Sequence, residues 1–217
     1  MFVERRMSHP AITIEPDVPI HDALNLMRKE GIRRLPVIND RGRMVGIISE
    51  RDILHAEPSD ATSLSVWELN YLLSRITVSD VMTRDVVSVL VDTPIEEAAR
   101  IMADSKIGGL PVMRGDDLAG IITETDLFKV FLELLGAREA GVRITALVRD
   151  VPGELAKLTA AVSAINGNIV AMVQFLGETP ENRLITLKVE GVSKVDLEAA
   201  LKGIPLELVD VRQTTGT

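Results

Sequence analysis

The sequence predicts a mixed α/β protein in which one unit occurs twice and a different unit follows. Leu35-Pro36-Val37 returns as Leu110-Pro111-Val112, and the segment Gly46–Asp52 returns as Gly120–Asp126. After Gly136 the spacing of apolar residues changes and matches neither copy. Two copies of a unit too small to bury its own apolar face are expected to pack on each other. The seam between them is the first place to look for a ligand.

Each copy reads as a strand, a helix, a β-hairpin and a second helix. In the first copy a short strand is expected at 11–14. Apolar residues at helical spacing predict a helix at 20–30 that ends at Gly31. Apolar, β-branched runs at 35–38 and 44–48 flank a turn-forming sequence and predict the hairpin.

A polar loop separates the copies, and Ser65-Val66-Trp67-Glu68 has the form of a capping box that opens a linker helix. Trp67 and Tyr71, one helical turn apart, are expected to pack on the domain. The predicted boundaries are 1–60 for the first copy, 61–76 for the linker helix, 77–136 for the second copy and 140–214 for the third unit.

The third unit alternates strands and helices in the order β-α-β-β-α-β. This order is that of the ferredoxin-like split unit, an α+β arrangement. The expected strands are 142–148, 169–176, 183–189 and 206–211, and the expected helices are 154–165 and 194–201.

Composition excludes several classes of function. The chain has 217 residues, a net charge of −8 and no cysteine, and only 3% of its residues are aromatic. Nucleic-acid binding is not expected, because it depends on Lys and Arg neutralising phosphates. The first residues lack the apolar stretch of a secretory signal, and no run is long enough to span a bilayer. A cytoplasmic protein without disulfides or membrane contacts is expected.

Catalytic templates are missing from the sequence. We find no phosphate loop, dinucleotide fingerprint, zinc-binding helix motif or nucleophile elbow. The three histidines, His9, His21 and His55, have no metal-like spacing. The sequence therefore gives no reason to expect an enzyme or a metal site.

The repeated Gly-Ile-Ile-Ser/Thr-Glu-x-Asp segment is the strongest candidate for chemistry. It ends a buried strand and opens a helix, where free backbone N–H groups favour an anion. Ser49 and Thr123 offer hydroxyls to a phosphate or ribose, and Asp52 and Asp126 offer carboxylates to a ribose diol. The same residues also form ordinary capping boxes, and recurrence cannot separate the two interpretations.

The ordered set of motifs from Met1 to Leu135 resembles tandem CBS domains, the module named after cystathionine β-synthase. The resemblance implies a Bateman module with two clefts that bind AMP, ADP, ATP or a related adenosine ligand, with no other cofactor required. The resemblance implies that Asp52 and Asp126 contact the ribose and that Ser49 and Thr123 contact the phosphate. It also implies that the base lies between two strand segments, with a proline of each copy nearby. These residues are Thr13, Ile14, Ser88 and Val89, with Pro36 and Pro111.

The two copies differ just before the Leu-Pro-Val strand. The first has Arg33-Arg34 where the second has Gly108-Gly109. Guanidinium groups bind phosphate in a bidentate manner, whereas a glycine pair permits close backbone approach. We hypothesise lopsided phosphate recognition in which Arg33 or Arg34 supplies most of the cationic contact. The alternative is that both arginines simply lead into a strand.

The third unit resembles an ACT domain in the stretch Val148–Leu155 and in Gly167-Asn168-Ile169. The resemblance implies pairing of two chains and an effector site involving Asp150, Gly153 and Asn168. Alternatively, these residues only start and end the intervening helix.

Two CBS motifs followed by an ACT domain resemble the acetoin-utilisation AcuB-type family over nearly the whole chain. The resemblance implies a homodimeric, non-catalytic regulator that senses an adenine nucleotide and acts on a partner, for example a metabolic enzyme. The alternative is a structural subunit of an enzyme complex whose clefts stay empty.

Overall fold

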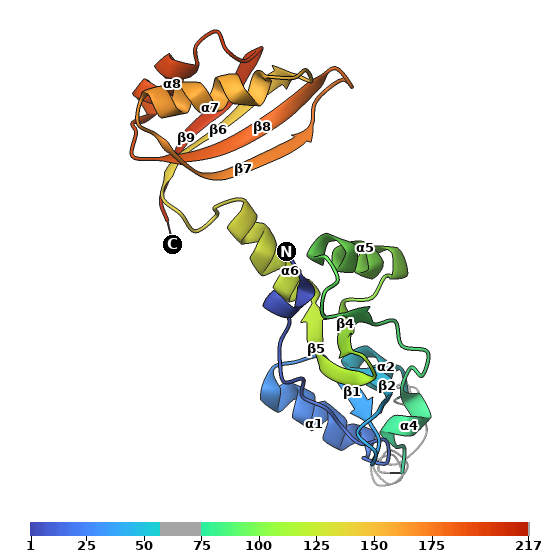
Figure 1. The fold of residues 1–217 in the computed structure, drawn as a ribbon. Helices are drawn as coiled ribbons and strands as arrows, with labels where there is room; N and C mark the ends of the chain where they lie inside the picture. Colours follow the sequence, from blue (N-terminus) through green and yellow to red (C-terminus); the bar gives the residue numbers. More distant parts are fainter. Residues whose placement is uncertain (57–74, 217) are drawn as a thin grey trace. The chain divides into compact units, whose positions relative to one another are not determined.

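A computed structural model describes residues 1–56 and 75–216, and the chain divides into two compact units, Met1–Leu127 and Phe128–Thr217. The capping box at Ser65, the linker helix that it opens, and the residues Trp67 and Tyr71 lie outside the described residues. In the described chain no helix is both long and apolar enough to cross a membrane. The α/β (α+β) class predicted from the sequence is confirmed (Figure 1).

The first repeat consists of α1 (Ile20–Glu30), β1 (Arg34–Ile38), β2 (Met44–Ser49) and α2 (Glu50–Ala56). The two strands pair antiparallel, with Leu35 opposite Ile48. Helix α1 buries the side chains spaced at helical period and ends at Gly31, whose φ of 65° is left-handed. The predicted helix and hairpin are therefore confirmed.

The strand predicted at 11–14 is reduced to one residue. Ile14 forms an isolated parallel bridge with Val37, donating its N–H to Pro36 O and accepting from Ile38 N. Ile14 is buried whereas Ile12 is exposed, so a single residue of this segment joins the sheet, through its backbone hydrogen bonds and its buried side chain. The prediction of a four-residue strand was wrong.

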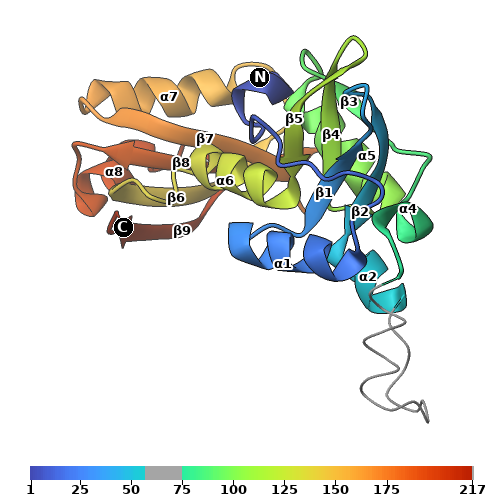
Figure 2. The ribbon, with the colours of Figure 1, turned by 90° about the horizontal axis from the view of Figure 1, so that it is seen from below.

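The second repeat begins with α4 (Val78–Val81) and continues through β3 (Val89–Leu90), α5 (Ile95–Ser105), β4 (Gly109–Arg114), β5 (Asp117–Thr123) and α6 (Glu124–Leu134). Strands β3, β4 and β5 form one sheet in that order, with α5 alongside (Figure 2). Both hairpins shift register at the same place, after Val37 in β1 and after Val112 in β4.

Each repeat is held by the segment that precedes the other. Ser8 exchanges backbone hydrogen bonds of 2.8 and 3.0 Å with Ile121 of the second repeat, and Thr83 exchanges two of 2.9 Å with Ile47 of the first. The neighbouring methionines lie against glycines of those hairpins: a Cβ on Gly46 would lie 2.5 Å from Met82 Sδ, and one on Gly120 would lie 2.8 Å from Met7 Sδ. These contacts explain why the Met and Gly positions recur together.

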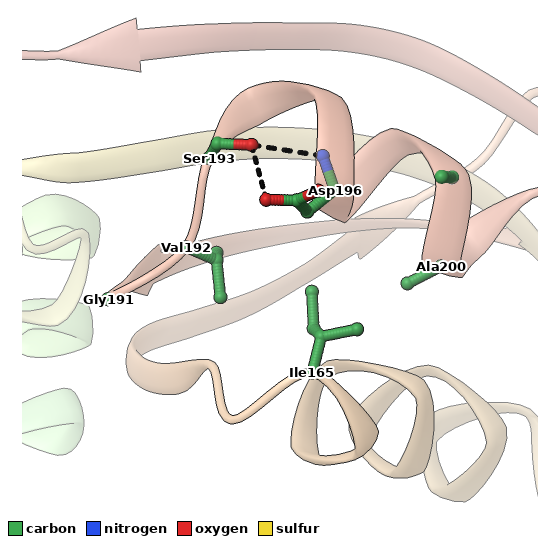
Figure 3. A pocket seen from close by; sticks show the side chains of 7 residues that line it. Ile165, Gly191, Val192, Ser193, Asp196 and Ala200 are labelled. Carbon is green, nitrogen blue, oxygen red and sulfur yellow. Dashed lines mark hydrogen bonds between the residues drawn. The ribbon is translucent and has the colours of Figure 1, made fainter.

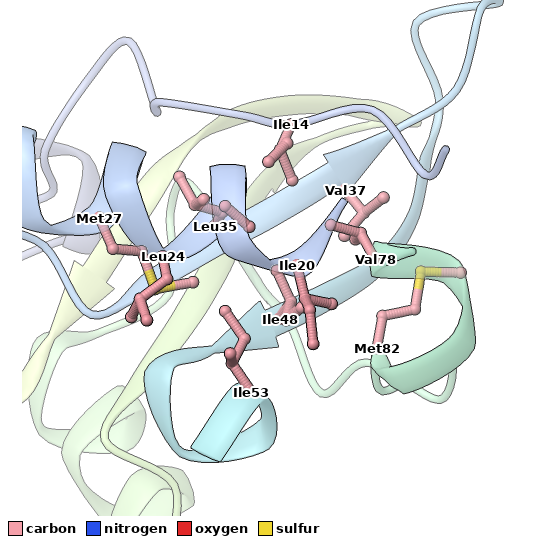
Figure 4. Close-up of a cluster of buried hydrophobic side chains, with 11 residues drawn as sticks. Ile14, Ile20, Leu24, Met27, Leu35, Val37, Ile48, Ile53, Val78 and Met82 are labelled. Atoms are coloured by element: carbon pink, nitrogen blue, oxygen red, sulfur yellow. The ribbon is translucent and has the colours of Figure 1, made fainter. Parts of the chain in front are cut away.

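The core of the first repeat includes residues beyond its predicted boundary. Val78 and Met82 of the second predicted unit pack among Ile20, Leu35 and Ile48 (Figure 4). On the other side, the fully buried Val3, in a 3-10 turn at Val3–Arg5 (η1), donates its N–H to Thr93 O of the second repeat. The packing units thus do not begin where the sequence copies begin.

The C-terminal unit is a four-stranded antiparallel sheet with two helices on one face (Figure 1). Its core joins side chains of both helices to those of the two central strands. The elements are β6 (Gly141–Arg149), α7 (Glu154–Ala164), β7 (Asn168–Leu176), β8 (Asn182–Glu190), α8 (Lys194–Leu201) and β9 (Glu207–Thr214). The sheet order is β7-β8-β6-β9, as the β-α-β-β-α-β prediction requires.

Candidate functional site

A cavity of about 350 Å³ lies between the two repeats, at the seam where a ligand was expected. Both repeats contribute to it: the first supplies the starts of β1 and α2, and the second supplies the segment before β3 and the start of β4. Its volume is within the range of small-molecule sites. The lining residues are Arg33, Arg34, Ile47, Ser49, Glu50, Arg51, Asp52, Thr83, Asp85, Val86, Val87, Lys106, Ile107, Gly108, Gly109 and Pro111.

Ser49 and Asp52 stand at the junction of β2 and α2, on the cavity wall. Asp52 Oδ2 accepts from Ser49 N at 2.8 Å and from Ser49 Oγ at 2.7 Å, and Ser49 Oγ accepts from Asp52 N at 3.3 Å. The capping interpretation is therefore realised. Capping does not remove the pair from the cavity, because both residues line it and both are only partly buried.

Thr123 and Asp126 repeat this arrangement between β5 and α6. Asp126 Oδ2 accepts from Thr123 N at 3.0 Å and from Thr123 Oγ1 at 2.7 Å. The carboxyl differs in its surroundings, since Asp126 is only 7% exposed and does not line the cavity.

The arginine pair and the glycine pair, which are aligned in the sequence, meet in this one cavity. A Cβ on Gly108 would lie 2.5 Å from Arg34 Nη2 and 2.7 Å from Glu124 Oε2, and one on Gly109 would lie 3.4 Å from Arg34 Cδ. The glycines thus provide the room that the Arg34 side chain occupies. Arginines in both copies would compete for the same space.

Burial lowers the pKa of Arg34 from its ordinary value. The carboxylate of Glu124 opposes that shift most, Arg33 adds to it, and Asp52 opposes it as well. Arg34 is therefore a partly desolvated cation placed between a carboxylate of each repeat. Partial desolvation strengthens the interaction of this guanidinium with any nearby anion, and the two carboxylates would compete with a ligand for it.

The cavity is cationic although the chain is acidic. Four cations line it, against three carboxylates, and an anionic ligand therefore meets a favourable local charge. The cations are Arg33, Arg34, Arg51 and Lys106, and the carboxylates are Glu50, Asp52 and Asp85.

Six residues predicted for nucleotide binding line this cavity: Arg33, Arg34, Ser49, Asp52, Gly109 and Pro111. The structure does not bring the other seven to its wall: Thr13, Ile14, Pro36, Ser88, Val89, Thr123 and Asp126. Ile14 and Val89 are buried against strands of their own repeats, which explains their absence from the wall.

Sequence reasoning did not assign ten of the lining residues to the site: Ile47, Glu50, Arg51, Thr83, Asp85, Val86, Val87, Lys106, Ile107 and Gly108. A signal for Thr83 and Asp85 was present, because Met7-Ser8-His9-Pro10 recurs as Met82-Thr83-Arg84-Asp85. That recurrence marked a repeated element without saying that it lines the seam. Within residues 1–56 and 75–216, no cluster of His, Asp and Glu suited to a metal ion is found.

A smaller hollow of about 170 Å³ lies at the turn between β6 and α7, and both Asp150 and Gly153 line it. Asp150 pairs with Arg183 at 2.7 Å. Glu154, 4% exposed, accepts from Lys157 Nζ at 2.6 Å. The hydrogen bond from Lys157 holds the pKa of Glu154 below its ordinary value, against the opposing effect of burial.

Asn168, the third residue predicted for an effector site, does not line that hollow. It stands at the start of β7, where its Nδ2 donates to Glu190 Oε1 at 2.6 Å. The eleven-residue helix α7 separates it along the chain from the turn that carries Gly153. Within one chain, the three predicted residues therefore do not form one site.

A third hollow lies where the end of α7 meets the start of α8 (Figure 3). Its polar groups satisfy each other: Ser193 Oγ donates to Asp196 Oδ2 at 2.6 Å and accepts from Asp196 N at 3.1 Å. Ile165, Val192 and Ala200 supply apolar wall. This pair caps α8.

The fold and the central cavity define a paired-repeat α/β protein with a C-terminal ferredoxin-like domain. The family comparison is more particular. The CBS domain model matches residues 3–59 and 78–133, and the model for the TTHA0829-like ACT domain matches residues 140–212. The chain belongs to the CBS-domain family and carries an ACT domain.

Individual relatives match the CBS region. A CBS domain-containing protein of Dictyostelium discoideum is 31% identical over 136 residues, covering 62% of this chain and 94% of the relative. In two other curated relatives, both uncharacterized proteins from Methanocaldococcus jannaschii, the match spans only 32% and 46% of the relative.

Two solved structures resemble the same region. A putative acetoin utilization protein (AcuB) from Vibrio cholerae is 32% identical with a TM-score of 0.53, covering 63% of this chain and 93% of its own. The CBS domain pair of protein MJ0100, solved with 5-methylthioadenosine and S-adenosyl-L-methionine, is 27% identical with a TM-score of 0.52, covering 64% of this chain and 98% of its own.

Proposed function

We propose that the chain is a non-catalytic regulatory protein whose CBS pair binds an adenosine nucleotide in the cavity between the repeats. One observation carries the proposal: the cavity joins the Ser49–Asp52 pair to a cluster of cations at the seam of the two domains. A carboxylate suits the two hydroxyls of a ribose, and guanidinium groups suit a phosphate.

The related CBS pair of protein MJ0100 supports the adenosine part of the ligand, since it was solved with two adenosine compounds. In this chain Asp52 would hold the ribose, with Ser49 and Arg34 near the phosphate. Pro111 and Val87 would supply apolar contacts to the base.

The regulatory part of the proposal concerns what ligand binding changes. A nucleotide that contacts both repeats binds best to one arrangement of them and so biases their packing. A coupling of about 1–3 kcal/mol is enough for a useful switch. The ACT domain would then pair two chains or sense a second effector near Asp150 and Gly153, and a metabolic enzyme would be the target.

A thermal-shift and calorimetry series tests the binding. AMP, ADP, ATP and the matching guanine nucleotides are added to the full chain. A ligand at 100 times its dissociation constant stabilises the fold by about 2.7 kcal/mol. We expect the adenine series to raise the melting temperature more than the guanine series. No shift and no heat with any adenine nucleotide would refute the proposal.

The capping geometry favours a second candidate, a structural subunit with empty clefts. Asp52 and Asp126 each accept two hydrogen bonds from their own helix start, so neither carboxylate needs a ligand. In that case the chain would copurify with an enzyme complex, and adding nucleotides would leave its melting temperature unchanged.

A further inference from the structure

Lys106 has a backbone conformation that its residue type disfavours. It is the C-cap of α5 with φ 55° and ψ 40°, in the left-handed region. The aligned residue of the first repeat, at the end of α1, is Gly31, which has φ 65°. Glycine adopts this region freely, whereas residues with a Cβ do so at a cost. The second repeat therefore carries a lysine where a glycine suits the backbone better.

The place of Lys106 in the molecule suggests why. It lines the cavity between the repeats together with Ile107 and Gly108 and with the Ser49–Asp52 pair of the first repeat. Its exposed side chain has no carboxylate partner among the ion pairs of the described residues. A strained backbone kept at a cavity wall points to a functional constraint.

A second cation of the cavity, like Lys106, aligns with an uncharged residue in the other repeat. Arg51 lines the cavity next to Asp52, and the residue aligned with it in the second repeat is the neutral Thr125. Around Asp52 the cavity thus gains Arg51 and Lys106. The aligned positions around Asp126 hold Thr125 and Gly31.

Of the two remaining cations, Arg34 is shared between the repeats. Arg34 and its aligned partner Gly109 both line the one cavity, so any pseudo-symmetric cleft near Asp126 would draw on the same arginine. Two phosphates beside one guanidinium would repel each other. The low exposure of Asp126 also disfavours that side.

We propose that Lys106 is a phosphate-binding residue of the Asp52 cleft and that the CBS pair takes one phosphorylated adenosine per chain on that side only. The inference rests on the proposed nucleotide binding. It adds which side of the CBS pair binds the nucleotide and how many nucleotides bind per chain. It favours ligands with a 5′-phosphate over the uncharged adenosine or a sulfonium compound.

Lys106→Gly is the decisive variant, because the proposal predicts two effects of opposite sign. Removing the side chain relieves the left-handed backbone, so the melting temperature without ligand should rise. Removing the ammonium should weaken AMP binding by about tenfold. Binding of adenosine, which lacks the phosphate, should change by much less. Lys106→Arg keeps the charge and should keep most of the AMP affinity.

Calorimetry and native mass spectrometry with AMP on the full chain give the readouts. One AMP per wild-type chain, with loss of affinity in Lys106→Gly, supports the proposal. Two AMP per chain, or unchanged AMP affinity in Lys106→Gly, overturns it while leaving the proposed function intact. No AMP binding by the wild type would instead remove the proposed function, and the inference with it.

Discussion

The two CBS repeats share a backbone and differ in charge. Both hairpins carry the same register shift, and both second helices start with a Ser/Thr-x-x-Asp cap. The differences involve the four cations that line the cavity. Arg33-Arg34 aligns with Gly108-Gly109, Arg51 with Thr125, and Lys106 with Gly31. Residues that hold the fold are thus kept in both copies, while the charges at the seam are not. The two repeats therefore share these backbone features but contribute different charges to the cavity.

Arg34→Ala should have the largest effect among tests of the charge difference between the two repeats. Losing a charged hydrogen bond to phosphate costs about 1.5–3 kcal/mol, so AMP affinity should fall tenfold or more. Arg33→Ala should have a smaller effect, because Arg33 is exposed whereas Arg34 is partly buried. Titration calorimetry measures both. Equal losses from the two variants would contradict the special place of Arg34.

Gly108→Ala gives an independent test of the same cation. The added Cβ would meet the ends of two flexible side chains, Arg34 and Glu124, so the fold should survive. The Arg34 side chain must move, and AMP affinity should fall. An unchanged affinity would show that the position of Arg34 over the glycines does not matter.

Gly120→Ala and Gly46→Ala compare the two reciprocal contacts. A Cβ on Gly120 would lie 2.7 Å from the backbone oxygen of Ser8, whereas the nearest backbone atom at Gly46 is Thr83 O at 3.0 Å. Overpacking costs about 1–3 kcal/mol, and we expect Gly120→Ala at the upper end and Gly46→Ala at the lower. Urea unfolding measures the difference, and the reverse order would contradict the packing described above.

Ser49→Ala and Thr123→Ala separate capping from ligand binding. Each removes a helix cap, so each should reduce stability by about 1 kcal/mol. Only Ser49 lines the cavity, and only its loss should also weaken AMP binding. Parallel thermal unfolding and calorimetry distinguish the two effects. Weaker AMP binding in Thr123→Ala would argue for a second occupied cleft.

Lowering the pH should reduce the stability contributed by the segment before the second repeat, which has an Asp80 cap, and not that of the segment before the first. We expect this to be the smallest effect of the series. The N–H and hydroxyl of Thr77 donate to Asp80 and lower the pKa of this carboxyl from its ordinary 3.8. A lowered folded-state pKa stabilises the fold above the unfolded value, and the benefit is lost as pH falls through the folded value. The turn at Val3–Arg5 has no side-chain cap.

Asp80→Asn should therefore be less stable than the wild type at pH 7. The gap should begin to close as the pH falls below the ordinary carboxyl value of about 4, and should narrow further toward the lowered folded-state pKa of Asp80. Thermal unfolding between pH 7 and pH 3 measures it. A gap that stays constant over this range would contradict the role given to the Asp80 carboxylate.

Local patterns predicted the regular elements well. The helical spacing from Ile20 to Met27 and the following Gly31 located α1, and alternation located β6. Periodicity shows which face of an element is buried but not against what. The sequence therefore could not show that Val78 and Met82 pack into the first repeat, or that only Ile14 of its segment reaches the sheet.

The candidate site was predictable only in part, for a related reason. Asp52 and Ser49 stood out by residue type and position, as did the arginine pair. The seam itself is made by residues far apart in the sequence, so the roles of Thr83, Val87 and Lys106 as lining residues required the packed structure. Lys106 is the clearest case, since its left-handed φ is not visible in the sequence.

The crossed contacts of Ser8 with Ile121 and of Thr83 with Ile47 have a consequence for the origin of the chain. They are the same bond made twice in opposite directions, as in an isologous interface between identical subunits. A lone ancestral unit with these residues could make both bonds with another molecule of itself. Gene fusion would then have freed each half to lose or gain charge independently, which a symmetric assembly of identical subunits does not permit.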